Sequence, residues 1–148
     1  MISGSNRGIG LAVAHRLLEG GAKLSLGMRD EMAAASQFGD AQDIILNRYH
    51  AHDVDSAQRW VENTVSTFRK IDGLVNNAGM SQPAVSLMDD DETRLDEMWA
   101  VNVKGPVRLT RFAMPYLAKS GSGRVVNVAS LSGKRVKNDN MGYAMTKF

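Results

Sequence analysis

The last residues of the chain carry two side chains that could share acid-base chemistry. Tyr143 and Lys147 stand four residues apart, and Ser130 lies upstream of them across a polar loop. On a helix, residues at this spacing lie on one face, with about 5–6 Å between their Cβ atoms. A phenol with an ordinary pKa of about 10 works near neutral pH only if that pKa falls by roughly 3 units, which is about 4 kcal/mol. One cation about 4 Å away supplies that energy at an effective dielectric of about 20.

The same spacing is also typical of helices that carry a buried tyrosine and a solvated lysine with no chemistry between them. Tyr143 and Lys147 taken alone therefore favour that structural interpretation. Further support for a catalytic interpretation has to come from other parts of the chain, and it lies at the opposite terminus.

A glycine-rich turn opens the chain and leads directly into a predicted helix over residues 11–18, with Ile9, Val13 and Leu17 on one face. Small glycines let backbone N–H groups approach a phosphate, and the helix N-terminus adds partial positive charge. We expect Gly4 to make the tight turn, Gly8 the close approach, and Gly10 the packing of helix on strand. Only residues 1–3 precede the turn, so the first strand looks clipped. Glycines that merely punctuate a loop are the alternative.

Strand and helix patterns alternate along the rest of the chain. Strands are predicted over residues 22–28, 43–49, 71–75 and 124–130, and helices over residues 31–35, 55–70, 92–106 and 107–117. This alternation predicts right-handed βαβ units and an α/β fold with a parallel sheet and helices on both faces. Gly105-Pro106 predicts a kink or a restart between the last two helices. The strand over 124–130 reads as nearly continuous apolar sequence, which predicts that it is buried.

Several polar groups at the ends of these elements have a structural and a functional interpretation. Asp30 suits a helix cap, and it also lies about 20 residues after the glycine turn, where an acid can bind the adenosine ribose. The two histidines and two aspartates of residues 50–55 invite a metal site, but solvated strand-end residues are favoured because no further ligands are in sight. Asp89–Glu92 favour a helix dipole over a metal cluster. Lys134, Arg135 and Lys137 form either a solvated rim or a contact for an anionic substrate.

Composition excludes several classes of protein. At 148 residues and 43% hydrophobic content, residues 1–148 have the size of a single domain with a real core. The net charge of +2 is spread along the chain, so nucleic-acid binding is not expected. With no cysteine, a disulfide framework, a thiolate zinc site and a cysteine nucleophile are excluded. No apolar run approaches the roughly 18 residues of a membrane span, so no membrane partner and a cytoplasmic location are expected.

Taken together, five motifs resemble the short-chain dehydrogenase/reductase family in content, order and spacing. They are Gly4-x-x-x-Gly8-x-Gly10, Asn76-Asn77-Ala78-Gly79, Asn102, Ser130 and Tyr143-x-x-x-Lys147. The resemblance runs from the first residues to the last. It implies a Rossmann-type doubly wound sheet, a nicotinamide dinucleotide, and hydride exchange with a carbonyl or alcohol substrate.

The resemblance also implies a role for each matching residue. Tyr143 would be the general acid or base, Lys147 would hold the nicotinamide ribose and lower the phenol's pKa, and Ser130 would bind the substrate oxygen. Asn102 would complete a proton relay through water. The cofactor would lie along residues Gly4, Ser5, Asn6, Arg7, Gly8, Ile9, Gly10, Asn77, Ala78 and Gly79, with Asp53 and Val54 flanking the adenine.

The end of the second strand indicates which dinucleotide is preferred. Met28 stands where family members that use NAD usually carry an acid, and Arg29 follows it. With Arg7 in the glycine turn, two guanidinium groups could converge on a 2′-phosphate, which predicts NADP(H). If Asp30 is instead the ribose ligand, its carboxylate would repel that phosphate and select NAD(H).

Three further expectations concern the whole protein. The sequence stops one residue after Lys147, so the fold looks truncated at both ends, and we expect the chain to be part of a longer polypeptide. Helices over residues 104–119 and from Met141 onward resemble the family's oligomer interface, which implies a homodimer or homotetramer. The alternative to an enzyme is a dinucleotide-binding module that senses or scaffolds without turnover. Such a module would need the glycine turn but not Asn102, Ser130, Tyr143 and Lys147 together.

Overall fold

The computed structural model describes residues 1–38, 42–86, 88, 90, 92–135 and 140–148. Within them, parallel strands form one sheet in the order β3-β2-β1-β4-β5. The strands are β1 (Ile2–Ser3), β2 (Leu24–Met28), β3 (Ile44–Arg48), β4 (Gly73–Asn76) and β5 (Arg124–Asn127). This order confirms the predicted Rossmann-type, doubly wound sheet.

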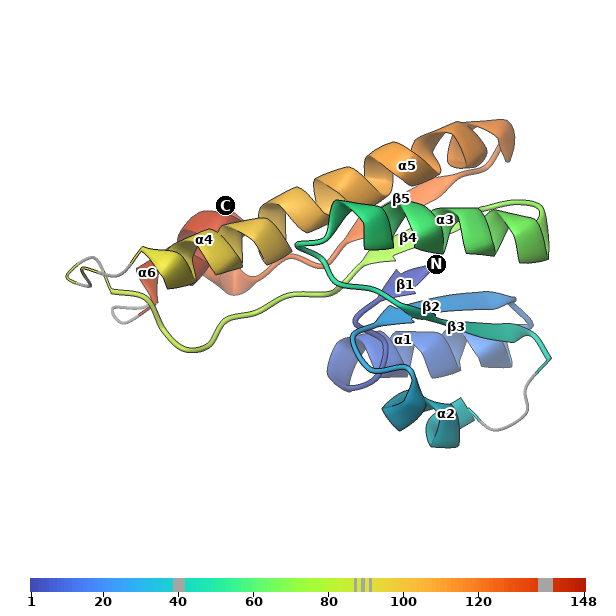
Figure 1. The fold of residues 1–148 in the computed structure, drawn as a ribbon, viewed down its shortest axis with the longest axis horizontal. Coiled ribbons are helices and arrows are strands. Elements are labelled where there is room, and N and C mark those ends of the chain that lie inside the picture. Colours follow the sequence, from blue (N-terminus) through green and yellow to red (C-terminus); the bar gives the residue numbers. More distant parts are fainter. Residues whose placement is uncertain (39–41, 87, 89, 91, 136–139) are drawn as a thin grey trace.

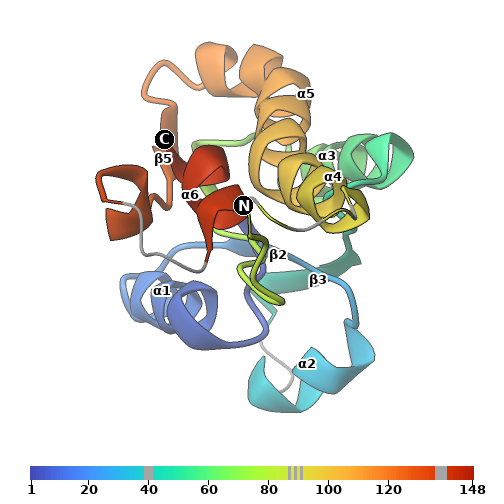
Figure 2. The same cartoon turned by 90° about the vertical axis from the view of Figure 1, so that its left-hand side faces the viewer.

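Helices cover both faces of the sheet (Figure 1). One layer holds α1 (Gly8–Glu19) and α2 (Met32–Phe38), and the other holds α3 (Val54–Phe68) and α5 (Gly105–Lys119). The short helices α4 (Thr93–Trp99) and α6 (Met141–Lys147) lie together at the end of the molecule that Figure 2 turns toward the viewer. Two irregular turns complete the fold, η1 (Ala100–Lys104) and η2 (Leu131–Gly133).

The sheet reverses its direction of growth at β1, which lies between β2 and β4. In such sheets, ligands bind in the crevice outside the carboxyl ends of the strands at this reversal. The glycine turn leaves the carboxyl end of β1, and Asn77 leaves the carboxyl end of β4. The topology therefore brings two of the sequence motifs to the edge where a ligand is expected.

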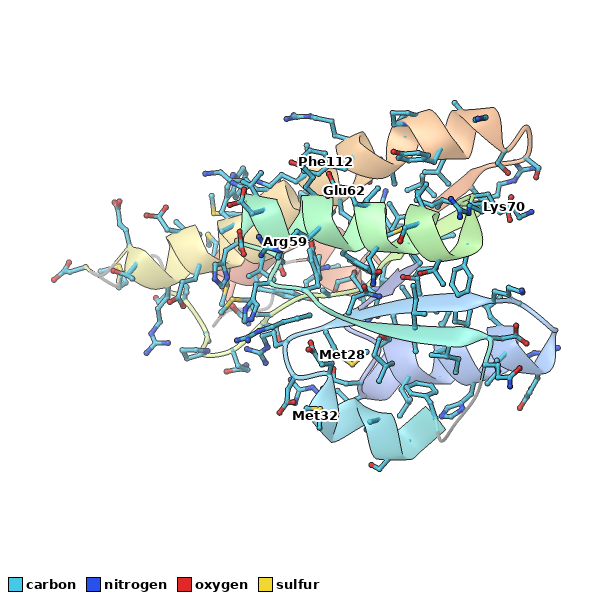
Figure 3. The ribbon with its side chains drawn as sticks, turned by 45° about the vertical axis from the view of Figure 1, so that its right-hand side comes forward. Met28, Met32, Arg59, Glu62, Lys70 and Phe112 are labelled. Atoms are coloured by element: carbon cyan, nitrogen blue, oxygen red, sulfur yellow. The ribbon has the colours of Figure 1, made fainter. Side chains whose placement is uncertain are left out.

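The core is divided between the two faces of β2, whose five residues are all buried. Leu24, Leu26 and Met28 pack toward the α1 side, and Figure 3 shows Met28 between the strand and that helical layer. On the other face, the Ser25 hydroxyl accepts a 2.8 Å hydrogen bond from the Trp60 indole of α3. Both layers are thus anchored to one central strand.

A single irregular turn joins α4 to α5. Residues Ala100–Lys104 form a π-helical turn, and Pro106 then lies in the first turn of α5, where its missing N–H is tolerated. A Cβ on Gly105 would lie 2.9 Å from the Ala51 side chain, so the helix approaches its neighbour closely at this point. The predicted irregularity at Gly105-Pro106 is confirmed, and it takes the form of a π turn.

The prediction that the fifth strand is buried was wrong. All four residues of β5 are exposed, including Val125 at 38% and Val126 at 52% of their surface. Adjacent residues of a strand point to opposite faces, so β5 is open on both sides. It is the edge strand of the described sheet and pairs with β4 alone. An apolar run shows that a strand can be buried, but the neighbouring elements decide whether it is.

The apolar stripe predicted for the first helix is also not the side that packs on the sheet. Ile9 is 63% exposed and Leu17 is 40% exposed, whereas Gly10 and Ala14 are buried. Val13 is partly buried against the core. The helix lies so close to β1 that only small residues fit between them, which turns the larger side chains outward.

Candidate functional site

The glycine turn leaves little room for side chains at Gly4 and Gly10. Gly4 and Gly8 have positive φ angles of 66° and 57°, which favour glycine. A Cβ on Gly4 would lie 2.9 Å from the Ala78 Cα, and a Cβ on Gly10 would overlap the Gly4 carbonyl and the Asn77 amide. These contacts confirm the tight turn at Gly4 and the close packing at Gly10.

The turn is tied to the loop that follows β4. The Ser3 hydroxyl oxygen accepts hydrogen bonds of 3.0 Å from the backbone N–H groups of Asn77 and Ala78. The Asn77 side-chain amide donates in return to the carbonyls of Ser3 and Gly4, both at 3.0 Å. Sequence reasoning missed Ser3, because its importance follows only from the neighbourhood of β1 and β4.

The space beside this turn is open and polar. A Cβ built on Gly8 would meet nothing within 4 Å, so the backbone there is open to a ligand. The twelve-residue helix α1 begins at Gly8, and the first N–H groups of a helix carry partial positive charge. Arg7 is exposed next to them, and the buried hydroxyl of Ser5 has no hydrogen-bond partner within the described residues. The residues present therefore fit an anionic group at this position.

The expected adenosine side of the crevice is less constrained. Arg29 is exposed directly after β2, beside the buried Met28. Asp53 caps α3, with one carboxylate oxygen accepting from the Asp55 N–H at 2.9 Å and the other 3.4 Å from Arg59. Its carboxylate is thus already engaged with its own helix. Val54 is 43% exposed and free to contact a flat ring.

A second wall of the candidate site is α6, which confirms the predicted helix. It places the Lys147 ammonium 5.9 Å from the centre of the Tyr143 ring. Lys147 also donates a 3.1 Å hydrogen bond to the Val128 carbonyl, just past β5.

The phenol of Tyr49 lies elsewhere, in the core. Burial raises the pKa of Tyr49 to about 12, partly opposed by the Arg108 charge, so that phenol stays protonated.

Ser130 reaches this wall through η2. It caps that turn, and its hydroxyl oxygen accepts a hydrogen bond of 3.2 Å from the Ser132 N–H. Gly133, at the end of η2, lies so close to the Lys147 carbonyl that a Cβ would overlap it. In the described part of the chain no hydrogen bond joins Ser130 to Tyr143. The packing of η2 on α6 sets the position of these two residues relative to each other.

Asn102 lies in the π turn and is 8% exposed. Its side-chain oxygen accepts from the Met80 N–H at 2.9 Å, and its amide donates to the Met80 carbonyl at 2.8 Å. A Cβ on Gly79 would lie 3.2 Å from that oxygen and 3.7 Å from the Lys147 ammonium. Gly79, Asn102 and Lys147 thus converge on one point.

A groove of about 1000 Å³ lies between α5, β5 and α6. Exposed apolar side chains of Trp99, Val107, Met114 and Phe148 line it, together with Lys147. It opens on the face of the sheet that carries α5, whereas the glycine turn begins α1 on the other face.

The remaining polar groups named in the sequence analysis lie outside this cluster or outside the described residues. Glu92 stands at the start of α4, but its side chain makes no capping hydrogen bond there, and Asp89 and Asp91 fall outside the described residues. Lys134 and Arg135 are exposed, and Lys137 falls outside the described residues. No group of three or more His, Asp or Glu in the described ranges is placed to hold a metal ion. Among the helices that the structure describes, none has the length and apolar character needed to cross a membrane.

Comparison with known proteins identifies relatives along the whole chain. Agropine synthesis reductase of Rhizobium rhizogenes is 43% identical over 148 residues, which are 99% of this chain and 34% of that protein. A short-chain dehydrogenase from Streptomyces avermitilis superimposes with a TM-score of 0.92 at 26% identity, over 99% of this chain and 55% of that one. A 3-ketoacyl-(acyl-carrier-protein) reductase from Brucella melitensis, solved with NADH, gives a TM-score of 0.90 at 29% identity and covers 99% and 62%.

The chain thus spans about a third of the length of its curated relative and somewhat more than half of these two solved chains. The sequence profile of the short chain dehydrogenase family matches residues 1–148. That match extends over the glycine turn, the π turn and the helix of Tyr143 and Lys147. The chain therefore belongs to the short chain dehydrogenase family.

Proposed function

We propose that the protein exchanges a hydride between NADP(H) and a carbonyl or alcohol substrate, with Tyr143 as the general acid or base. The observation that carries the proposal is the approach of Lys147 to two groups, the Tyr143 ring at 5.9 Å and the neighbourhood of Asn102 and Gly79. This cluster lies beside the loop that the glycine turn holds by hydrogen bonds. An anion site and an acid-base pair are therefore connected through the loop of Asn77, Ala78 and Gly79.

The cofactor's diphosphate is assigned to the glycine turn, where Gly8 leaves the backbone open at the N-terminus of α1. Its adenine is assigned to the surface of Asp53 and Val54. The remaining contacts are assigned to Ser5, Asn6, Arg7, Ile9, Asn77, Ala78 and Gly79, and to Tyr143 and Lys147 on the facing wall. The bound nicotinamide supplies or accepts the hydride.

The chain's own groups handle the proton. In reduction, the Tyr143 phenol donates its proton to the substrate oxygen, and in oxidation the phenolate takes it back. Ser130 accepts its hydrogen bond from Ser132, which leaves its O–H free to donate to the same substrate oxygen. Lys147 gives one N–H to Val128 and has two left, which are assigned to the nicotinamide ribose.

Asn102 is assigned to a proton relay that runs through water. Both N–H groups of its side chain are already engaged, by Met80 and by Thr146, so a water has to bind an oxygen. The water is assigned to the backbone carbonyl of Asn102, which has no α-helical partner because Pro106 lacks an N–H. In the π pattern of this turn, the N–H of residue 107 is the group that would compete with the water for that carbonyl.

The preference for NADP(H) is assigned to Arg29 with help from Arg7. The residue before Arg29, Met28, is buried and carries no charge that could repel a phosphate. Each guanidinium would form charge-assisted hydrogen bonds to a 2′-phosphate worth about 1.5–3 kcal/mol. Two such contacts correspond to a preference of roughly a hundredfold or more over NAD(H).

Dissociation constants for NADPH and NADH test this preference. We expect the unmodified protein to bind NADPH about a hundredfold more tightly, and Arg29→Ala to weaken NADPH binding much more than NADH binding. Arg16→Ala, in the last turn of α1, is the matched control and should leave both constants unchanged. Asp30→Asn should also leave their ratio nearly unchanged. Equal or tighter NADH binding in the unmodified protein would make Asp30 the ribose ligand instead.

A hydride-transfer assay against a panel of ketones and alcohols tests the activity itself. The absorbance of NADPH reports turnover in either direction. Turnover of at least one carbonyl or alcohol is expected. Tight NADPH binding with no turnover across the panel would favour the dinucleotide-binding module that senses or scaffolds.

Self-association and a cytoplasmic location complete the proposal. Trp99, Val107 and Met114 expose apolar surface along α4 and α5, at 40%, 52% and 47%. Covering such a surface with a second copy would give a homodimer or a homotetramer. Light scattering of the purified protein measures this directly, and a strict monomer at all concentrations would contradict it.

A further inference from the structure

Thr146 lies in α6 between the two residues assigned to catalysis, and it is 7% exposed. Its hydroxyl donates a 2.8 Å hydrogen bond to the Tyr143 carbonyl, one turn back along the same helix. The same oxygen accepts a 2.9 Å hydrogen bond from the Asn102 side-chain amide. A single buried hydroxyl therefore joins the helix of Tyr143 and Lys147 to the π turn.

The Asn102 amide has no spare donor once this contact is made. One of its N–H groups goes to the Met80 carbonyl and the other goes to Thr146, while its oxygen accepts from the Met80 N–H. These bonds fix which way the amide faces. They also connect three segments distant in sequence, namely the loop after β4, the π turn and α6.

The other polar contacts of α6 lie at its two ends. At the N-terminal end, Asn140 donates to the Ser81 carbonyl at 2.7 Å, and the Gly142 N–H reaches the Val85 carbonyl at 3.3 Å. At the C-terminal end, Lys147 donates to Val128. Thr146 adds a contact to a third neighbour, the π turn, and so limits rotation of the helix about its own axis. That rotation is the motion that would swing Tyr143 and Lys147 together relative to Asn102 and Gly79.

We propose that Thr146 is a positioning residue, whose hydroxyl holds the Tyr143–Lys147 turn in register with the π turn of Asn102. The inference rests on the proposed function for its catalytic consequence, but the positioning itself is a property of the fold. Valine has nearly the same shape as threonine and lacks the hydroxyl, so Thr146→Val removes the link and leaves an Asn102 N–H buried without a partner. Serine keeps the hydroxyl, so Thr146→Ser should restore the link.

The test measures the titration of the Tyr143 phenol by NMR with ring-labelled tyrosine, using Tyr143→Phe to assign the signal. In Thr146→Val we expect the titration to move, because the turn that carries Tyr143 and Lys147 shifts as a unit relative to Asn102 and Gly79 and the surroundings of the phenol change. Thr146→Ser should titrate like the unmodified protein. Thr64→Val is the matched control, since Thr64 is also buried and also bonds a carbonyl one turn back, in α3. It should change stability and leave the Tyr143 titration where it was.

Turnover is measured on the same variants. Thr146→Val should lower kcat about tenfold to a hundredfold with a nearly unchanged KM for NADPH, and it should shift the pH profile in the direction of the phenol titration. An unmoved Tyr143 titration in folded Thr146→Val, or a titration moved equally by Thr64→Val, would overturn the positioning role. If the unmodified protein shows no turnover but Thr146→Val still moves the titration, the proposed function fails and the positioning role stands. If Thr146→Val does not fold, a shifted titration in Thr146→Ser decides against the role, because serine keeps the hydrogen bonds.

Discussion

The glycine turn and α6, the two walls of the candidate site, are held in place by different kinds of contact. On the side of the glycine turn, the backbone itself fills the space, so that a single added carbon at Gly4 or Gly10 meets another backbone segment. On the side of α6, polar side chains reach across gaps, as Asn102 does to Thr146 and Lys147 does to Val128. The first wall is set by steric exclusion, and the second by directed hydrogen bonds.

This difference predicts opposite responses to substitution. Where packing of backbone on backbone sets the geometry, adding one methyl group should unfold the site. Where hydrogen bonds set it, removing one polar atom should leave the fold intact and change the chemistry. The same contrast extends to the strands, because β2 is buried along its whole length and β5 is exposed along its whole length.

The largest effect is expected at Gly10. Gly10→Ala places a Cβ against the Gly4 carbonyl and the Asn77 amide, neither of which can move without opening the turn. We expect a loss of at least about 3 kcal/mol in the free energy of unfolding, together with loss of dinucleotide binding. Gly73→Ala is the control, since a Cβ there meets nothing within 4 Å, and it should change stability by less than about 1 kcal/mol. Equal behaviour of the two variants in a denaturant titration would remove the steric account of this wall.

The next effect compares the two strands. Leu26 in β2 is fully buried, and Val126 in β5 is 52% exposed. Leu26→Ala should lower the free energy of unfolding by about 2–5 kcal/mol, through lost burial and the cavity left behind. Val126→Ala should lower it by less than about 1 kcal/mol. Chemical denaturation of both variants measures the difference. A large loss in Val126→Ala would mean that β5 is covered in solution by a segment or a second copy.

The smallest effect concerns how the two long helices end. The helix α3 is followed directly by Arg69 in a left-handed conformation with φ of 63°, whereas α5 ends two residues before Gly121, which has φ of 74°. Glycine adopts this conformation without strain and arginine does not. Arg69→Gly should therefore raise the free energy of unfolding by about 1 kcal/mol, and Gly121→Ala should lower it by about the same amount. Thermal unfolding of the pair would contradict this account if both changes had the same sign.

The sequence predicts the fold well because its periodic patterns are local. Runs such as 24–28 and 54–68 fix their own secondary structure, and right-handed connections then leave few arrangements of the strands. Burial is not local, which is why the apolar run at Val125 and Val126 was misjudged. What lies above and below a strand is decided by segments far away in the chain.

In the candidate site, too, local motifs were predictable from the sequence and long-range contacts were not. Gly4, Gly10, Asn102, Tyr143 and Lys147 belong to short motifs, and the structure places Gly4 beside Gly10 and Lys147 beside Tyr143 and Asn102. Ser3 and Thr146 escaped notice, because their partners lie 74 and 44 residues away and neither belongs to a recognisable spacing. Small buried hydroxyls next to a motif are the signal that would have found them.

The central claim is that Tyr143 transfers the proton while the rest of the crevice binds the cofactor. Tyr143→Phe keeps the aromatic ring and removes only the hydroxyl, so turnover and NADPH affinity can be measured on one variant. We predict that kcat falls by about 10²–10⁴-fold and that the dissociation constant for NADPH changes by less than about threefold. A Tyr143→Phe protein that keeps most of the unmodified turnover rate would contradict the assignment of Tyr143 as the acid-base group.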